Sequence, residues 1–374
     1  MIKGQLKQDD TVRYEQPKTD YRKIVKINQS ALKTYDKNPR QFYKEFILGE
    51  KREEKLTYSL MLGSIVDFIM LECNADFQEF EQRLDEQFYL YEGVRGDGQM
   101  FDLSDKLYDF TMRDTIDGEI TSTFLARFSE AFDYVQGLGK FKGKEVSKVV
   151  DIFVGSKEEE YFKSKMEAVG KMVIDTRLLE KAKQIAEKVL NDEKVGPLFK
   201  YTEDYGFNVY NHLVIEWEYE TLFGNKIECK QEVDKLDVDH RTKTVQPYDT
   251  KAVYDSEGFA YSYLKYGYYV QQCFYSLGIL QWMDKQGIGD YALLPFNFIV
   301  IDTSSDNLKP LIFETTEQDF LRALDGFSIN GRKYAGVRGL FEEVNWAMEN
   351  NIFDISKENF DNNQMVKLNL RYDD

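Results

Sequence analysis

Residues 205–251 constrain the fold of this chain more than any other stretch, because hydrophobic and polar side chains alternate along three successive runs within them. Two short turn sequences separate these runs, FGN at 223–225 and HRTK at 240–243. A period of two residues is typical of strands with one buried face, and short turns join strands that run antiparallel. We therefore predict an antiparallel meander of three strands here.

Helical patterns flank this meander on both sides. Residues 28–72 show the spacing of three helices with a break at Pro39, and residues 261–287 show the spacing of one long amphipathic helix. Buried strands are predicted within 291–303 and 308–316, followed by one or two C-terminal helices. Helices at both ends of a central mixed sheet predict an α/β (α+β) fold.

Composition divides the chain into parts. Residues 27–73 and 201–350 are predicted to form a core domain, whereas 74–200, which is acidic, aromatic and broken by glycine-containing turns, is predicted to be a helical insertion or cap. Residues 1–26 are polar and aperiodic, which is typical of an arm that is ordered only when it docks, and 351–374 are predicted to be a C-terminal tail. The core domain is thus interrupted by the insertion.

Charge, cysteine content and hydropathy exclude several classes of protein. The formal charge of −17 argues against a protein that coats nucleic acid through a uniformly basic surface, so any DNA contact must be local. Cys73, Cys229 and Cys273 lie far apart, which excludes a disulfide framework and a four-thiolate zinc or iron–sulfur site. The sequence lacks a run of about eighteen apolar residues and the apolar region of a signal peptide, so we expect no membrane association and a cytoplasmic location.

Acidic residues on two strands of the meander are predicted to face each other. With a four-residue loop in the second turn, Asp239 pairs with Thr244, and the same register sets Asp234 opposite Asp249. Lys251 shares a face with Asp249, because side chains two residues apart in a strand point the same way. Two facing carboxylates repel each other unless a cation lies between them, and Mg²⁺ prefers such oxygen ligands. Considered alone, Asp249 and Lys251 also fit a surface ion pair worth under about 1 kcal/mol.

The order of Asp234 and the DTK triplet at 249–251 resembles the metal-binding motif of the PD-(D/E)XK nuclease superfamily. In the RecB- and RecE-like type of this superfamily, the strand with the motif is followed by a helix with the pattern Q-x-x-x-Y. The stretch YYVQQCFY follows here, and its Gln271 and Tyr275 have that spacing. Residues four apart lie on one face of a helix.

Other segments resemble the same families in collinear order. SALKTYDKNPRQFYKEF, from Ser30, is similar to their opening helical motif, and LGSIVD is similar to their G-x-x-x-H helix, with Gly63 matching and Asp67 in place of the histidine. GKMVIDTRLLEKAKQIAEKVL resembles the helix before their sheet, IECKQEVDKL the strand with the first acid, and GRKYAGVRGL a stretch of their closing helix. The resemblance covers 28–72 and 170–350.

The resemblance implies a metal site that binds Mg²⁺ or Mn²⁺. Its ligands would be the carboxylates of Asp234 and Asp249, the backbone carbonyl of Thr250, and the side chain of Asp67. An aspartate in place of the family's histidine could ligate the metal directly while adding negative charge. The metal preference of this site is therefore an open question.

The resemblance also implies roles for residues around the metal. Lys251 would be the catalytic lysine, and Gln271 and Tyr275 would position that lysine or the end of the DNA strand. Glu216 and Glu218 are further candidate ligands, for which a solvent-facing position is the alternative.

The function implied by the resemblance is that of a Mg²⁺-dependent deoxyribonuclease with a restriction-endonuclease-like core. Within the superfamily, a RecE-like exonuclease acting on the ends of linear double-stranded DNA fits best, with a single-strand-annealing protein as a further partner in phage or prophage recombination. Homo-oligomerisation, strand polarity and exonuclease against endonuclease action stay open.

Two other interpretations compete with the RecE-like exonuclease. One is a catalytically weak or inactive nuclease-fold protein with a structural or nuclease-inhibiting binding role, which the −17 charge, Asp67 and the acidic insertion favour. The intact acid–lysine and glutamine–tyrosine pairs oppose it. The other is a CRISPR-adaptation nuclease with an iron–sulfur cluster, which the cysteine content disfavours.

Overall fold

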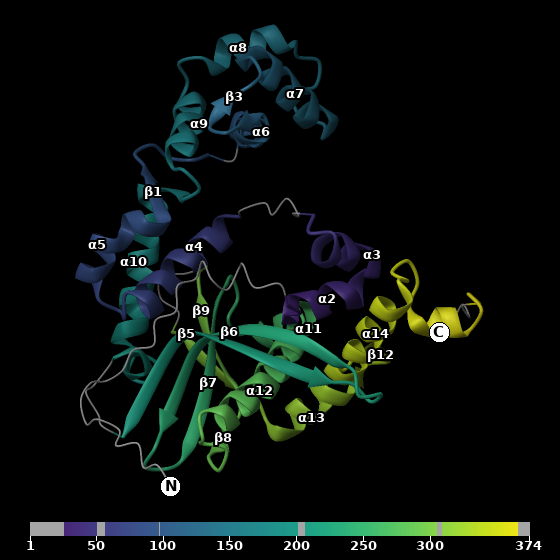
Figure 1. The fold of residues 1–374 in the computed structure, drawn as a ribbon. Coiled ribbons are helices and arrows are strands. Elements are labelled where there is room, and N and C mark those ends of the chain that lie inside the picture. The colour runs from purple at the N-terminus through teal and green to yellow at the C-terminus, as the bar shows by residue number, and fades with distance from the viewer. Residues whose placement is uncertain (1–25, 51–56, 97, 201–205, 305–308, 366–374) are drawn as a thin grey trace, which may run out of the picture. The chain divides into compact units, whose positions relative to one another are not determined.

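The computed structural model describes residues 26–50, 57–96, 98–200, 206–304 and 309–365 (Figure 1). The chain divides into two compact units, the larger formed by Met1–Ser59 with Lys188–Asp374 and the smaller by Leu60–Glu187. The smaller unit thus begins and ends earlier in the chain than the insertion predicted from composition. The predicted N-terminal arm lies outside the described residues except for its last residue, Lys26.

The larger unit is built on a mixed sheet whose strands lie in the order β10-β9-β7-β6-β5, with β8 pairing with β7. Its strands are β5 Phe207–Glu220, β6 Lys226–Asp239, β7 Thr244–Val253, β8 Ala292–Leu293, β9 Asn297–Asp302 and β10 Leu311–Glu314. β5, β6 and β7 pair antiparallel in succession, which confirms the predicted meander. β9 is parallel to β7, and β10 is antiparallel to β9.

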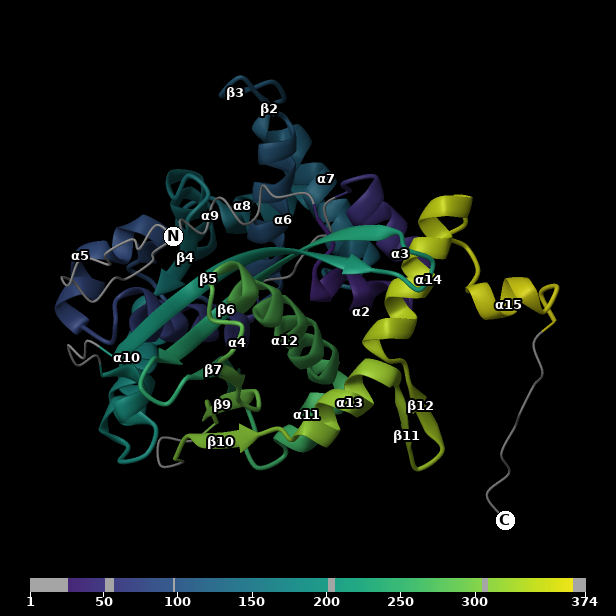
Figure 2. The ribbon, with the colours of Figure 1, turned by 60° about the horizontal axis from the view of Figure 1, so that its bottom comes forward.

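Helices accompany this sheet in the larger unit. They are α2 Gln29–Lys37, α3 Pro39–Phe42, the π-helix η1 Tyr43–Ile47, the 3₁₀ helix η3 Gly196–Phe199, α11 Phe259–Lys265, α12 Tyr268–Lys285, α13 Glu317–Asp325, α14 Val337–Asn350 and α15 Lys357–Asp361. α12 packs against β5 and β6 and also contacts α2, α13 and α14 (Figure 2). Among the described residues, no helix combines the length and apolarity needed to cross a bilayer.

Two predictions for the helices of the larger unit are wrong. The single helix expected over 261–287 is two helices, because Gly267 adopts a left-handed conformation (φ 66°) between α11 and α12. α12 is also not amphipathic, since every residue from 269 to 276 is buried. The GRKY stretch, expected in a closing helix, forms instead the antiparallel hairpin of β11 Phe327–Ile329 and β12 Arg332–Tyr334.

The smaller unit is mainly helical. Its helices are α4 Tyr58–Asp67, the π-helix η2 Phe68–Glu72, α5 Phe77–Gln87, α6 Gln99–Arg113, α7 Phe124–Gly137, α8 Val146–Phe153, α9 Lys157–Glu167 and α10 Thr176–Asn191; α4 begins and α10 ends in the larger unit. Its short strands are β1 Phe88–Tyr91, β2 Thr115–Ile116, β3 Glu119–Ile120 and β4 Met172–Asp175. β1 pairs with β4 in parallel, and β2 pairs with β3 in a hairpin. These strands were not predicted from the sequence.

The buried core of the larger unit shows a change of side-chain alternation in the middle of β5 and β6. On β6 the core residues occupy odd positions at Ile227, Cys229 and Val233 and then even positions at Leu236 and Val238. On β5 the core residues change from an even position at Tyr210 to odd positions at Leu213, Ile215 and Trp217. The side chains that face the core therefore shift by one position in the middle of each strand.

The residues at this change are His212 and Asp234. Asn211 pairs with Lys235 and Leu213 with Val233, and the pairing skips the two residues between them. His212 has a φ of 51°, which is uncommon for a residue with a β-carbon. Left-handed backbone at a residue other than glycine is sparsely populated, and such residues cluster at active sites and ligand-binding segments. This distortion places Asp234 at an irregular point of an otherwise continuous strand.

Candidate active site

The meander positions the two predicted metal-binding carboxylates. β6 and β7 pair from Asp239 with Thr244 to Lys235 with Tyr248, which confirms the predicted register. The next position in this register, Asp234 with Asp249, lies one residue beyond the last of those pairs. The prediction that the hairpin brings these two acids to neighbouring positions therefore agrees with the strand pairing.

Asp234 contacts the backbone of the predicted motif. Its Oδ2 accepts hydrogen bonds from the backbone N–H of Thr250, at 2.9 Å, and from the Thr250 hydroxyl, at 3.3 Å. The carboxylate of β6 is thereby held beside β7 at the residue between Asp249 and Lys251. Thr250, the predicted backbone ligand, is thus part of the same arrangement.

Asp249 is almost completely buried, with 1% of its surface exposed. Its Oδ1 accepts a hydrogen bond from Nε2 of Gln271 at 2.5 Å, and its Oδ2 forms an ion pair with Nζ of Lys251. Apart from this ion pair, Oδ2 has no hydrogen-bond partner among the described residues. A metal ion could use Oδ2 by sharing it with the ammonium of Lys251 or by displacing that ammonium.

Lys251 is held as a cation by the surrounding acids. Burial by itself lowers the pKa of Lys251, but the carboxylates of Asp249 and Asp234 outweigh that effect and hold the pKa above its ordinary value. A lysine with a raised pKa keeps its proton at neutral pH. Its ammonium can stabilise negative charge on a phosphate or orient a water molecule, but it cannot act as a general base.

α12 brings the predicted glutamine and tyrosine to different environments. Gln271 contacts Asp249, as described above. Tyr275, one turn later, is buried; its backbone carbonyl accepts a hydrogen bond from Nε2 of Gln231 at 2.9 Å, and its ring centroid lies 6.3 Å from that of Phe296. Gln271 therefore links the helix to the site, whereas these contacts of Tyr275 link the helix to the core of the sheet.

Two residues at this site were not predicted from the sequence, Lys33 of α2 and Tyr268 of α12. Nζ of Lys33 lies 5.9 Å and Nζ of Lys251 5.0 Å from the centroid of the Tyr268 ring. Burial and the positive charge of Lys251 lower the pKa of Lys33 to about 8, although Asp249 acts in the opposite direction. Lys33 has no hydrogen-bond or ion-pair partner within the described ranges. The opening motif that SALK resembles does not include this lysine.

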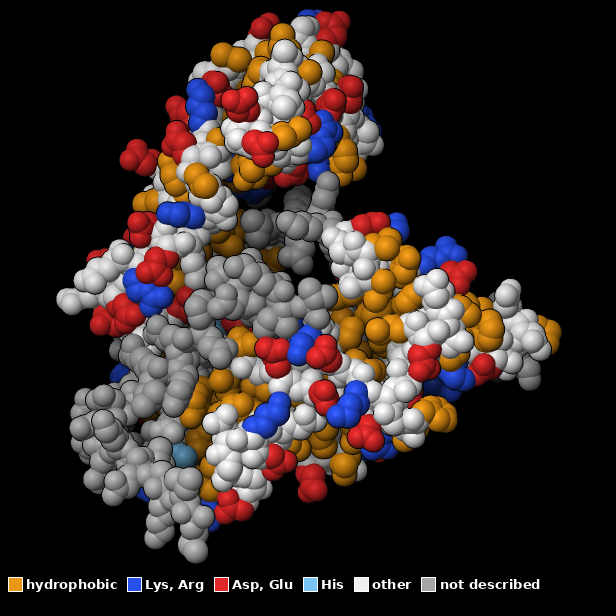
Figure 3. All heavy atoms as spheres, viewed as in Figure 1, with side chains coloured by type: hydrophobic (Ala, Val, Ile, Leu, Met, Phe, Trp, Pro, Cys, Tyr) orange, Lys and Arg blue, Asp and Glu red, His pale blue; other side chains and the backbone are white. Residues whose placement is uncertain are grey.

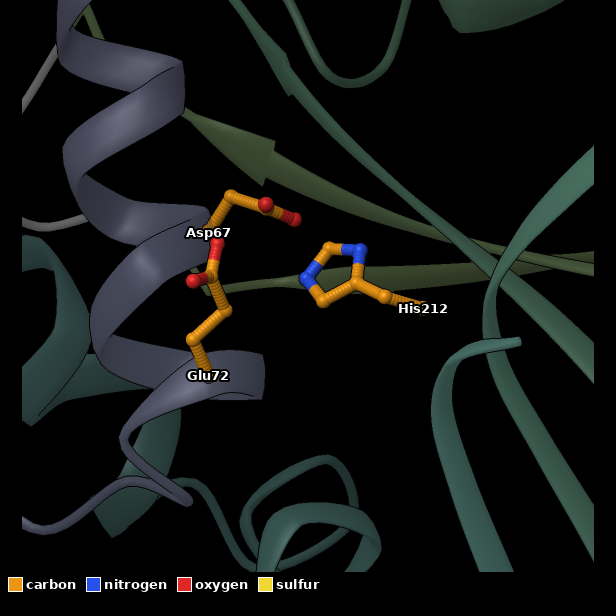
Figure 4. Close-up of side chains that lie close together, drawn as sticks. All are labelled: Asp67, Glu72 and His212. Carbon is orange, nitrogen blue, oxygen red and sulfur yellow. The ribbon is translucent and has the colours of Figure 1, made fainter. Parts of the chain in front are cut away.

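Asp67 lies in a different unit from the other predicted site residues. It is the last residue of α4, and Glu72 is the last residue of η2, in the smaller unit, whereas His212 belongs to β5 of the larger unit (Figure 4). Within its own unit, Glu72 accepts a hydrogen bond from Nε2 of Gln87 at 2.7 Å. His212 contacts Glu232, with 3.2 Å between Nδ1 and Oε1. The set brought together within one unit is Asp234, Asp249, Lys251 and Gln271.

Glu216 and Glu218, the further candidate ligands, are exposed and paired with lysines. Oε2 of Glu216 lies 2.8 Å from Nζ of Lys26, and Oε2 of Glu218 lies 2.9 Å from Nζ of Lys226. Exposed pairs of this kind contribute little to stability. This geometry agrees with the solvent-facing alternative.

Comparisons with known proteins do not assign this site. Neither the models of known protein families nor the curated proteins contain a match to the sequence. Any function must therefore be argued from the side chains around Asp249 and from the resemblance of the motifs.

Proposed function

We propose that the protein is a metal-dependent deoxyribonuclease that hydrolyses phosphodiester bonds. The observation that carries this proposal is the arrangement of Asp249, a buried carboxylate oriented by Gln271 and paired with Lys251, next to Asp234 of the adjacent strand. The PD-(D/E)XK resemblance assigns catalytic roles to these same residues. The most specific form of the proposal is a RecE-like exonuclease that acts on the ends of linear duplex DNA.

The donor groups fit Mg²⁺ or Mn²⁺. Asp249 contributes a buried carboxylate whose Oδ2 faces the ammonium of Lys251, and Asp234 contributes a second carboxylate from β6. Divalent cations of this kind prefer carboxylate and carbonyl oxygens, and the Thr250 carbonyl is a further candidate ligand. A bound ion would supply an activated water and stabilise charge on the phosphoryl oxygens.

The side chains of the site have distinct roles in this mechanism. Gln271 fixes the orientation of Asp249 through Oδ1, while Oδ2 faces the ammonium of Lys251, which a metal ion would have to share or displace. Lys251, as an ammonium, stabilises the negative charge that develops on the phosphate oxygens. In hydrolysis, the water gives up a proton as its oxygen forms a bond to phosphorus, the bond from phosphorus to one sugar oxygen breaks, and that sugar oxygen takes up a proton.

The sheet supports a restriction-endonuclease-like core as part of the proposal. Three antiparallel strands are followed by two helices, by the short β8, which pairs with β7, and then by β9, which returns parallel to β7. The site lies on β6 and β7, where β7 is central in the sheet. A central strand is a rigid support for catalytic groups.

The charge distribution requires local contacts with DNA. On the face shown in Figure 3, basic side chains are interspersed with acidic ones rather than gathered in one surface. The chain as a whole carries a formal charge of −17. Lys33 and Lys251 are therefore the cations that we expect to contact phosphates at the site.

The proposal is tested with linear duplex DNA labelled at the 5′ or the 3′ end, incubated with Mg²⁺ or Mn²⁺. We expect metal-dependent digestion that Asp249→Ala and Lys251→Ala abolish. Lys243 and Asp290 form an exposed aspartate–lysine pair at 2.6 Å in the same unit, so Asp290→Ala is a matched control that should remain active. Digestion that needs no metal, or that survives both active-site substitutions, would refute the nuclease assignment.

A non-hydrolytic protein with the same fold is the second candidate. Its support is that Lys251 pairs directly with Oδ2 of Asp249, the oxygen that a metal would need, and that aspartate stands at position 67 where the families have histidine. Such a protein would have a structural or nuclease-inhibiting role. It would bind DNA or a nuclease in the same assays without digesting DNA at any metal concentration.

The first proposal implies a cellular setting for the protein. A RecE-like exonuclease would act in the cytoplasm of a bacterial host, where its single-stranded product is the substrate of a single-strand-annealing protein. Co-elution of the purified protein with such an annealing protein in size-exclusion chromatography would support this context.

A further inference from the structure

A continuous series of rings and lysines begins at the active site. Nζ of Lys251 lies 5.0 Å from the centroid of the Tyr268 ring, and the Tyr268 ring lies 6.0 Å from that of Tyr266, at an interplanar angle of 43°. The left-handed Gly267 separates the two tyrosines along the chain. The aromatic groups next to the catalytic lysine therefore continue onto α11.

The series becomes exposed on α11. Nζ of Lys265 lies 5.2 Å from the centroid of the Tyr266 ring and 5.6 Å from that of Tyr261. Tyr261 is 68% exposed and Tyr266 is 47% exposed, so both residues are accessible to solvent. We call Tyr261, Lys265, Tyr266 and Tyr268 the tyrosine track.

We propose that the tyrosine track binds single-stranded nucleic acid where the strand leaves the active site. Exposed rings stack with bases of any sequence, and a lysine between two rings can contact the phosphate between two bases. This inference rests on the proposed nuclease function, because the track adjoins the active site at Lys251. It also explains how a chain with a charge of −17 holds a polyanion, since the cations lie where the strand runs.

Charge and continuity favour a nucleic acid over a protein as the occupant. Within the described residues, Lys265 of the track and Lys33, which lies across Tyr268 from it, form no ion pair with a carboxylate. A peptide that covered the rings would leave these ammonium groups without counter-charges unless it were acidic. A strand whose phosphodiester lies at Asp249 and Lys251 supplies both the bases and the phosphates.

The test measures binding of a fluorescein-labelled 20-nucleotide oligothymidylate by fluorescence anisotropy in EDTA, so that no digestion occurs. In the double variant Tyr261→Leu with Tyr266→Leu, we expect Kd to rise by at least about fivefold per ring. The double variant Tyr261→Phe with Tyr266→Phe keeps the rings and should bind within about twofold of the wild type. Tyr134→Leu is the matched control, because Tyr134 is a 43% exposed tyrosine of the smaller unit with Nζ of Lys106 4.3 Å from its ring centroid.

Lys265→Ala tests the phosphate contact separately. Loss of one phosphate contact to a single strand should reduce the slope of log Kd against log salt concentration by about 0.7. An unchanged slope would show that Lys265 does not contact a phosphate of the bound strand.

A small substrate tests the nuclease proposal independently of the tyrosine track. Methyl p-nitrophenyl phosphate is a phosphodiester without a nucleobase, so its Mn²⁺-dependent hydrolysis should be lost in Asp249→Ala and unchanged in the track variants. If the oligonucleotide binds through the tyrosines but no diester is hydrolysed, the track stands and the nuclease proposal fails. The track is overturned if the wild type does not bind the oligonucleotide, if the leucine variant binds as tightly as the wild type, or if the phenylalanine variant loses as much affinity as the leucine variant.

Discussion

Gln271 of α12 donates its side-chain amide to Oδ1 of Asp249 on β7, so that a residue of the covering helix orients a buried carboxylate of the sheet. The same carboxylate pairs through Oδ2 with Lys251. Gln271, Asp249 and Lys251 thus form one connected network, so a substitution of any one of them should affect the other two.

Replacing Gln271 by alanine should weaken metal binding. Without the amide, Asp249 loses the partner that fixes its orientation, and comparable changes around metal ligands reduce metal affinity by about 10- to 100-fold. Titration of free Mn²⁺ by electron paramagnetic resonance measures this directly. Gln281→Ala is the control, because Gln281 lies on the same helix and contacts β5 through the carbonyl of Glu218; equal Mn²⁺ affinities of the two variants would contradict the role of Gln271.

Lys251 should stay protonated through the alkaline range. Its pKa in the folded protein is raised above the ordinary value of 10.5. A raised pKa contributes stability that is fully present below the unfolded-state pKa and is lost only as the pH rises through the folded-state pKa. We therefore expect no loss of this contribution between pH 7 and about pH 10. Chemical-denaturation curves of Lys33→Met and of the double variant Lys33→Met with Lys251→Met should differ by a constant amount over that range, because Lys33, whose pKa depends on Lys251, is absent from both. A difference that shrinks toward pH 9 would contradict the prediction.

Lys33 should respond to pH in the opposite sense. Burial and Lys251 lower its pKa to about 8, so the unfolded chain binds this proton more tightly than the folded protein does. Stability should therefore rise with pH between about 8 and 10.5, and below that window the charged Lys33 is destabilising. We expect Lys33→Met to unfold at a higher temperature than the wild type at pH 7, by the equivalent of roughly 1–3 kcal/mol.

Thermal unfolding at pH 7 and pH 10 tests the prediction for Lys33. The stabilisation by Lys33→Met should shrink as the pH rises, because the wild-type amine is then neutral as well. Lys44→Met, at an exposed position of η1, is the control and should change little at either pH. A constant difference at both pH values would show that packing, and not charge, is responsible.

Gly278 should not tolerate a methyl group. A β-carbon there would lie 2.3 Å from Oε1 of Gln231 and 2.7 Å from Nε1 of Trp217, where α12 passes close to β5 and β6. Overpacking of this kind costs about 1–3 kcal/mol, which exceeds the gain of about 1 kcal/mol from alanine in a helix. Gly278→Ala should therefore lower the unfolding temperature. At Gly339 of α14 no atom lies within 4 Å of the added carbon, so Gly339→Ala should leave stability unchanged or raise it.

Local patterns were sufficient to predict the centre of the fold. The alternation of side chains, the two short turns and the four-residue loop determine β5, β6 and β7 and their register, because a hairpin of that length allows few pairings. The same local argument placed Asp234, Asp249 and Lys251 on neighbouring strands. It failed at Gly267, where one glycine in a left-handed conformation divides a helical pattern, and at GRKY, where a turn at Gly331 with φ of 74° makes a hairpin.

The sequence by itself determined the meander, its register and the pairing of an acid with a lysine on β7, since all of these depend on residues close together in the chain. Tertiary structure alone decided that Gln271 orients Asp249, that Lys33 and Lys251 flank Tyr268, and that the alternation of β5 and β6 changes at His212 and Asp234. These relationships join helices and strands that are distant in sequence, and they follow from how α2 and α12 pack on the sheet. Periodicity reports which side of an element is buried, but it does not report which element covers that side.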